Sequence, residues 1–183
     1  MIYTDWKFDE NTKTVYNVPM GSWVDIDIWP KGKAGFDARY RVDEDRLFVY
    51  CNGTDHWADW LHHFAPWAGR RERQGAEMIL KRLGPHITGR HVIIGGYSLG
   101  GAVAAELARL IPYSVLFLAG SKRPRKRIRG NYKALKVRGD VVTALPPWRP
   151  RIRKMQKVGR WTWKFWKAHM SGEYQEFLRI AGF

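Results

Sequence analysis

The stretch that decides the fold is His91–Ala105, with the sequence HVIIGGYSLGGAVAA. An apolar run comes first, a pair of glycines follows it, and an alanine-rich segment comes next. This order predicts a buried strand that turns sharply into a helix. Residues 96–100 match the pattern G-x-S-x-G, which sets Ser98 on the turn. A serine there is exposed for attack on a carbonyl, and the helix N-terminus directs amide hydrogens at the developing negative charge.

A glycine-rich turn of this kind also occurs as a passive connection or as a phosphate-binding loop. Here no P-loop lysine follows the turn, and the dinucleotide-binding spacing G-x-G-x-x-G is missing. The pattern and its strand–turn–helix context therefore favour a nucleophilic serine.

Strand-like and helix-like segments flank this unit along the chain. An alternation of apolar and acidic residues over 23–29 predicts a half-buried strand. Residues 70–83 carry apolar side chains at helical spacing and predict a helix that Gly84 and Pro85 end. Further strands are expected over 36–42, 47–51, 113–118 and 134–138, and further helices over 99–111 and 171–178. The alternation predicts an α/β fold with a mostly parallel central sheet flanked by helices.

No change of composition marks a domain boundary, so residues 1–183 are expected to form one domain. Within this domain, residues 1–45 are expected to form an N-terminal hairpin region. Residues 122–131 predict a basic loop, and residues 149–160 predict a loop or an edge hairpin.

The net charge of +15 comes entirely from the last third of the chain. Residues 1–120 hold 14 basic and 14 acidic residues, whereas residues 121–183 hold 18 basic and 3 acidic ones. A field of this sign favours anionic partners such as nucleic acid, anionic lipid or an acidic polymer. An apolar content of 45% excludes a wholly disordered chain, and a single cysteine, Cys51, excludes a disulfide framework. Cys51 ends a predicted buried strand and is expected to be a small core residue.

A nucleophilic serine needs a base, and the base needs an acid that orients it. In the α/β-hydrolase fold these residues follow in the chain order serine, acid, histidine. His169 is the only histidine after Ser98, and only Glu106 and Asp140 lie between the two. Glu106 falls in the helix directly after the turn, whereas Asp140 follows a predicted strand. The order assigns Ser98, Asp140 and His169 as a catalytic triad, which needs no metal and no cofactor.

Residues 47–174 resemble the class 3 lipases, a family with the α/β-hydrolase fold. The motifs that carry the resemblance are YSLGGA at 97–102, NGT at 52–54 with DWL at 59–61, DVVTALPP at 140–147, and His169 with Tyr174 five residues later. The family has HSLGGA, RGT....DWL and D-x-V-P-x-L-P-P in the matching places. This chain departs from those patterns at Asn52, Tyr97 and Thr143. It is also short for the family, and residues 55–69 leave little room for a long lid.

The resemblance implies an oxyanion hole formed by Thr54 and by the amide of Leu99, the residue after the nucleophile. Removal of one such donor typically costs about 10²–10³ in rate. Candidates for the substrate pocket are Trp57, Trp60, Tyr97 and Trp148. Ordinary core packing is the alternative for the tryptophans.

Residues 161–167, WTWKFWK, interleave aromatic residues with lysines just before His169. Tryptophan favours the membrane interface and lysine favours anionic headgroups, so the segment predicts a lipid-contacting surface. Its candidate residues are Trp161, Trp163, Lys164, Trp166 and Lys167. Three alternatives remain open: a strand with tryptophans inside and lysines outside, a nucleic-acid-binding face, and an ordinary solvated face of basic residues.

The sequence therefore predicts a serine hydrolase that cleaves carboxylic esters of acyl lipids, phospholipids included, through an acyl-enzyme intermediate. One alternative is a thioesterase or polymer esterase with the same triad. Another is a nucleic-acid-binding protein on an inactive hydrolase scaffold. No apolar run has the ~18 residues needed to span a bilayer, and residues 1–10 show no secretory signal. We expect a protein that is cytoplasmic or released on lysis, with peripheral contact to anionic membranes.

Overall fold

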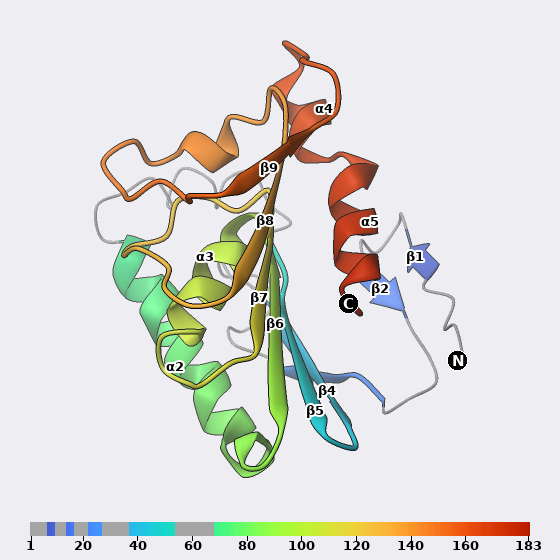
Figure 1. The fold of residues 1–183 in the computed structure, drawn as a ribbon, viewed down its shortest axis with the longest axis vertical. Coiled ribbons are helices and arrows are strands. Elements are labelled where there is room, and N and C mark those ends of the chain that lie inside the picture. The colour runs from blue at the N-terminus through green and yellow to red at the C-terminus, as the bar shows by residue number, and fades with distance from the viewer. Residues whose placement is uncertain (1–6, 10–13, 17–21, 27–36, 54–67) are drawn as a thin grey trace.

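The computed structural model describes residues 7–9, 14–16, 22–26, 37–53 and 68–183. Its main feature is a seven-stranded sheet in which every strand pairs with its neighbours in sequence (Figure 1). The strands are β3 (Val24–Ile26), β4 (Ala38–Asp43), β5 (Arg46–Cys51), β6 (His91–Tyr97), β7 (Val115–Ala119), β8 (Tyr132–Val137) and β9 (Met155–Val158). β3, β4 and β5 pair antiparallel, and β5 to β9 pair parallel. The predicted α/β fold with a mostly parallel sheet is confirmed. A separate antiparallel pair joins β1 (Lys7–Asp9) to β2 (Thr14–Tyr16).

Helices cover both faces of the sheet. On one face lie α2 (Ala68–Ile87) and α3 (Ser98–Leu107); on the other lies α5 (Gly172–Ile180), which follows the short helix α4 (Phe165–His169) (Figure 1). Successive side chains of a strand point to opposite faces. In β5, Leu47 and Val49 pack with residues of α2 and α3, whereas Phe48 and Tyr50 pack with Tyr174 and Leu178 of α5. The continuous apolar run of β5 is thus explained by burial on both sides.

Several boundaries differ from the expected ones. α2 continues through Gly84 and Pro85 to Ile87. Pro85 lies in the last turn of α2 and has no amide hydrogen to donate to the carbonyl of Lys81; Lys81 is exposed, so water can satisfy that carbonyl. The segment expected as a loop or edge hairpin over 149–160 contains β9, which pairs parallel with β8. Of the strand expected over 23–29, residues 24–26 form β3, and the rest beyond Ile26 lies outside the described residues.

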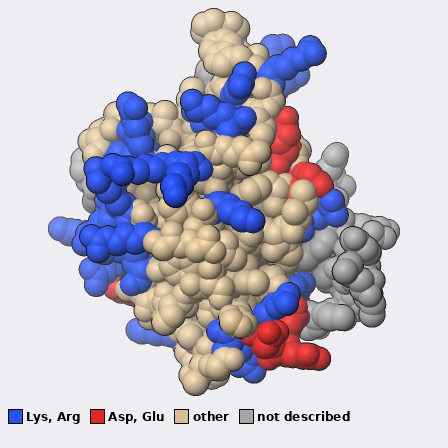
Figure 2. Space-filling model, viewed as in Figure 1, with Lys and Arg blue, Asp and Glu red and all other residues tan. Residues whose placement is uncertain are grey.

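Basic side chains cover much of one side of the molecule. Figure 2 shows Lys and Arg gathered beside α2 and around the end of the sheet that carries α4, while Asp and Glu lie mainly on the opposite side. Among the residues that the structure describes, no helix combines the length and the apolar character needed to cross a bilayer.

The carboxyl ends of the parallel strands lie at the same end of the sheet, and the loops that follow these strands bring distant residues together. β5 leads into Asn52 and Gly53, β6 into Ser98, and β8 into Asp140. In open α/β sheets ligands bind at the carboxyl ends of the strands. The candidate site lies there.

Candidate active site

Ser98 occupies the sharp turn between β6 and α3. Its φ of 55° lies in the left-handed region, which non-glycine residues seldom adopt. A Cβ at Gly100 would stand 2.1 Å from the carbonyl oxygen of Cys51, and one at Gly96 would stand 2.6 Å from the carbonyl oxygen of Gly100. Both glycines of the G-x-S-x-G pattern are therefore required by close backbone approaches. The turn holds the serine in a strained conformation at the start of a helix.

The structure brings the three residues of the predicted triad into one hydrogen-bonded row. Nε2 of His169 lies 2.8 Å from Oγ of Ser98, and Nδ1 lies 3.0 Å from Oδ2 of Asp140. All three side chains are buried. With the ring proton on Nδ1, His169 donates to Asp140 and accepts from the Ser98 hydroxyl, which is the arrangement that a general base needs.

Asp140 is held by two further donors. The backbone amide of Val142, at the start of the 3₁₀ turn η1 (Val142–Ala144), donates to Oδ1 at 2.9 Å. The hydroxyl of Tyr174, in α5, donates to Oδ2 at 2.5 Å and accepts from the amide of Val137 at 2.8 Å. Burial, and then the charge of Asp140, raise the pKa of Tyr174 above its ordinary value, so the phenol stays a donor. Asp140 therefore has its carboxylate plane fixed from both sides.

Tyr97 packs against His169 and hydrogen-bonds to its backbone. Its ring stacks on the His169 imidazole at a centroid distance of 5.2 Å and an interplanar angle of 18°. Its hydroxyl donates to the backbone carbonyl of His169 at 2.5 Å, and burial raises its pKa. This residue, a sequence candidate for the substrate pocket, thus contacts the triad directly. Tyr97 and Tyr174 together fix the base and the acid; the sequence motifs contained both residues but did not reveal these contacts.

The oxyanion side of the site is described in part. Leu99 is the second residue of α3, and the first amides of a helix have no partner within it. A Cβ at Gly53 would lie 3.1 Å from Cβ of Ser98, so the loop after β5 leaves the sheet beside the serine. Thr54, Trp57 and Trp60 lie outside the described residues.

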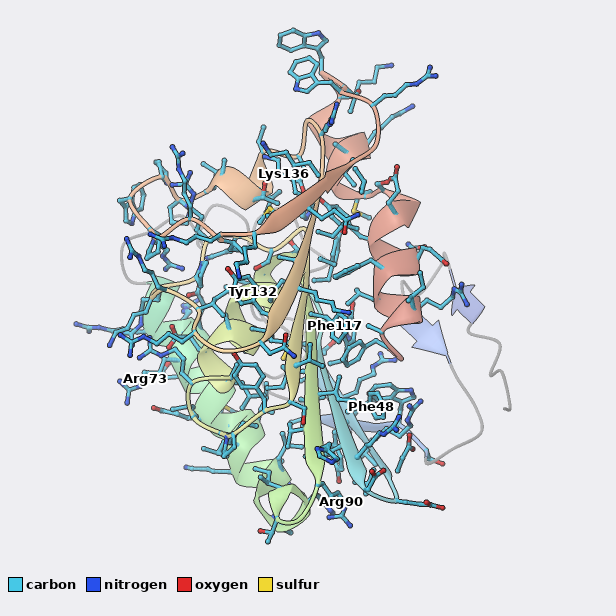
Figure 3. All side chains as sticks on the ribbon, in the orientation of Figure 1. Phe48, Arg73, Arg90, Phe117, Tyr132 and Lys136 are labelled. Atoms are coloured by element: carbon cyan, nitrogen blue, oxygen red, sulfur yellow. The ribbon has the colours of Figure 1, made fainter. Side chains whose placement is uncertain are left out.

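The remaining tryptophan candidates are exposed where the structure describes their side chains. Trp148 is 64% exposed, Trp161 55% and Trp163 84%. The alternative in which the WTWKFWK segment forms a strand with its tryptophans inside is therefore wrong. Lys164 and Lys167 are also exposed; Trp166 lies in α4, but its side chain is outside the described part. Figure 3 shows the side chains of the loop between β9 and α4 pointing away from the sheet.

A buried ion cluster beside the site went unnoticed in the sequence. In α2, Oε1 of Glu72 lies 2.6 Å from Nζ of Lys122, and Oε2 of Glu72 lies 2.7 Å from Nη1 of Arg149. All three residues are buried, and the amide of Lys122 donates to the carbonyl of Ser98 at 3.2 Å. Burial lowers the pKa of Lys122, and Glu72 opposes that change. The cluster ties α2 and two basic loops to the serine turn. The signal in the sequence is the helical spacing of Glu72, which lies four residues before Ala76 and seven before Ile79 and so falls on the apolar face of the predicted helix.

Other titratable residues take no part in the triad. Glu106, the second acid considered, is buried and lies 3.6 Å from Nε of Arg125. Burial raises the pKa of Cys51 to about 12, so its thiol stays protonated. Within the described ranges no group of three or more His, Cys, Asp or Glu side chains is placed to hold a metal ion.

Comparisons with known proteins find a likeness in fold to solved structures. No family model matches the chain, and no curated protein matches it. The chain is similar to a solved structure of a fungal lipase, with a TM-score of 0.50 and 17% identity over 68% of this chain and 59% of that one. It is also similar to a variant of MDLA from Penicillium cyclopium, with a TM-score of 0.48, 15% identity and the same coverage. The chain therefore shares the fold of a fungal lipase structure, an α/β fold with a mostly parallel sheet, and its match spans under two thirds of the length of that structure.

Proposed function

We propose that this protein is a serine hydrolase that cleaves carboxylic esters of acyl lipids. The observation that carries the proposal is the unbroken row from Ser98 through His169 to Asp140, at 2.8 and 3.0 Å, on a strained serine at a helix start. A structural metal or cofactor is not needed for this chemistry. The lipase-like fold supports a lipid ester as the substrate.

In the first half of the proposed reaction, Nε2 of His169 takes the hydroxyl proton as Oγ of Ser98 attacks the ester carbonyl. The carbonyl oxygen gains negative charge, which the amide of Leu99 stabilises. The resemblance to the class 3 lipases adds Thr54 as the second donor to this oxygen. The imidazolium then protonates the leaving alcohol, and an acyl-Ser98 remains. In the second half His169 deprotonates a water, the water attacks the acyl carbon, and the acid leaves as the proton returns to Ser98.

Asp140 has a defined part in both halves. Its Oδ2 holds Nδ1–H of His169, which keeps Nε2 free to accept a proton and stabilises the imidazolium that forms. The two supporting donors, the amide of Val142 and the hydroxyl of Tyr174, favour the ionised carboxylate. The second tyrosine, Tyr97, keeps the imidazole plane in line with Ser98.

The test is release of acid from a long-chain acyl ester and labelling by a fluorophosphonate, in wild type, Ser98→Ala and Ser114→Ala. Ser114 is exposed and lies outside the site, so it is the matched control. We expect Ser98→Ala to lose labelling and at least about 10⁴ in kcat with its folding intact. Hydrolysis that survives in Ser98→Ala would rule the mechanism out.

A thioesterase or polymer esterase would use the same triad, and comparison of acyl-thioester with lipid-ester turnover separates these substrates. The basic surface favours one further candidate, a nucleic-acid-binding protein on an inactive scaffold. That protein would bind DNA or RNA with strong salt dependence and leave Ser98 unlabelled by the fluorophosphonate.

A further inference from the structure

Two tryptophans project from the loop between β9 and α4. Trp161 is 55% exposed and Trp163 is 84% exposed, and their rings meet edge to face with centroids 4.0 Å apart. In Figure 1 this loop extends beyond the rest of the ribbon at the end of the molecule that carries α4. Side chains of this size are rarely left together in water unless they meet a partner. We call residues 160–164 the tryptophan tip.

The base of the tip is fixed to the active site. A Cβ at Gly139, directly before Asp140, would lie 2.3 Å from the carbonyl oxygen of Thr162. Gly139 has a φ of 92°, a conformation that suits glycine. The hydroxyl of Thr162 accepts from the amide of Lys164 at 3.1 Å, and the chain then enters α4, which ends at His169. The tip is therefore connected at its base to both the acid and the base of the triad.

Cationic side chains surround the tip. Arg160, Lys164 and Lys167 are all exposed, and Figure 2 shows basic residues gathered at this end of the molecule. The sequence holds no Asp or Glu between Asp140 and Glu173, and Asp140 is buried. Glu173 of α5 lies below the tip, where its Oε1 would be 3.1 Å from a Cβ at Gly159, and a partner above it meets indole rings and positive charge.

Two further apolar side chains are exposed directly after residues of the triad. Val141, which follows Asp140, is 42% exposed, and Met170, which follows His169, is 52% exposed. Single exposed apolar side chains are common on proteins, but here they follow the acid and the base of the triad and accompany two exposed tryptophans of the same chain segment. A partner that is apolar inside and anionic at its surface matches this combination.

We propose that the tryptophan tip and Lys167 dock the protein on an anionic phospholipid bilayer. The indoles of Trp161 and Trp163 enter the headgroup region, where tryptophan is favoured, and the cations contact headgroup phosphates. The edge-to-face arrangement, with an interplanar angle of 89°, argues against nucleic acid. Successive bases stack on open ring faces, and here the edge of one indole covers a face of the other. The inference that the bilayer supplies the ester substrate rests on the proposed function. The docking on the bilayer does not depend on it.

Sedimentation with vesicles of phosphatidylglycerol and phosphatidylcholine tests the docking, with Ser98→Ala as the parent so that no lipid is consumed. We expect binding that falls with salt and is weak on phosphatidylcholine alone. Trp161→Ala with Trp163→Ala lowers the partition coefficient roughly tenfold or more. Lys164→Gln and Lys167→Gln lower it about fivefold each. The matched controls Ile180→Ala and Arg82→Gln, which change exposed residues on α5 and α2, leave it unchanged.

A soluble short-chain ester checks folding and separates the two proposals. The tip variants in the wild-type background should hydrolyse it normally and lose only their activity on anionic vesicles. Trp163→Ala alone, at the most exposed position, serves if the double variant does not fold. Equal binding by parent and tip variants, or binding to single-stranded DNA instead of vesicles, would overturn the docking proposal. A wild-type protein that binds vesicles but splits no ester would remove the proposed function and leave the docking intact.

Discussion

The hydroxyl of Tyr174 gives the sharpest test of how the acid of the triad is held. In Tyr174→Phe the ring stays in the core and only the hydroxyl is lost. That hydroxyl donates to Oδ2 of Asp140 at 2.5 Å, the same oxygen that faces Nδ1 of His169. Without it, Oδ1 is still held by the amide of Val142, but nothing described besides His169 fixes Oδ2. The carboxylate then gains freedom to rotate away from the imidazole.

The size of the effect follows from the kind of bond. A hydrogen bond to a charged group contributes about 1.5–3 kcal/mol, and 1.36 kcal/mol is a factor of ten in rate. Loss of the donor also makes Oδ2 a stronger acceptor for His169, which offsets part of the positional loss. We therefore expect kcat to fall roughly tenfold, at the low end of that range. KM should stay the same, because Tyr174 is 1% exposed and cannot contact substrate.

The assay is steady-state hydrolysis of a soluble ester by Tyr174→Phe, Asp140→Asn and the double variant. If Tyr174 acts through Asp140, its removal costs little once Asp140→Asn is present, because the two changes are then not additive. Tyr132→Phe is the matched control, since its hydroxyl donates to Arg153 outside the site. The lost acceptor for the amide of Val137 should lower the free energy of unfolding by about 1–3 kcal/mol, so rates are compared well below the urea midpoint. Unchanged kcat, or the same loss in both backgrounds, would refute the reasoning.

Further changes test the packing around the site. Glu72→Gln leaves two buried cations without their carboxylate, and urea unfolding should show a loss of about 3–5 kcal/mol; a loss below about 1 kcal/mol would contradict this. Gly100→Ala drives a Cβ into backbone and should cost at least about 3 kcal/mol, whereas Gly84→Ala, with open space around it, should stabilise by about 0.5–1 kcal/mol. Cys51 has a pKa raised to about 12, so the folded protein holds its thiol proton at a pH where the unfolded chain has lost it. The contribution of this thiol to stability is full below its pKa in the unfolded chain, near 9, and is lost as pH rises toward 12. Between these pH values the free energy of unfolding should therefore fall less steeply with pH in Cys51→Ala than in wild type. Equal slopes in the two proteins would contradict the burial argument.

The fold was predictable because its decisive signals are local. A strand that is buried on both faces, as β5 is, must be apolar throughout, and a serine turn at a helix start needs its glycines. The chain order of serine, acid and histidine left one candidate for each position, and the structure brings those residues within hydrogen-bond distance. Such signals are written in consecutive residues.

The parts that could not be predicted depend on contacts across the sequence. The Tyr97 and Tyr174 hydroxyls meet His169 and Asp140 only after the sheet forms. Helix α2 was expected to end before Pro85, but Pro85 lies in its last turn, where the missing amide leaves unbonded only the carbonyl of the exposed residue Lys81. Burial of Lys122 runs against its residue type, because a lysine in a basic run is normally solvated. The carboxylate that permits the burial, Glu72, is 50 residues away in sequence.

The basic residues of the last third therefore fall into two structural groups that composition alone does not separate. Lys122 and Arg149 are buried against Glu72 and hold basic loops on the serine turn, whereas Arg160, Lys164 and Lys167 face solvent around the tryptophan tip. Salt distinguishes the two groups, because it screens exposed charges strongly and buried pairs weakly. Rising ionic strength should thus release the protein from anionic vesicles while hydrolysis of a soluble ester continues. Part of the basic excess is thus paired with the carboxylate of Glu72 on another element, and the docking proposal concerns the part that faces solvent.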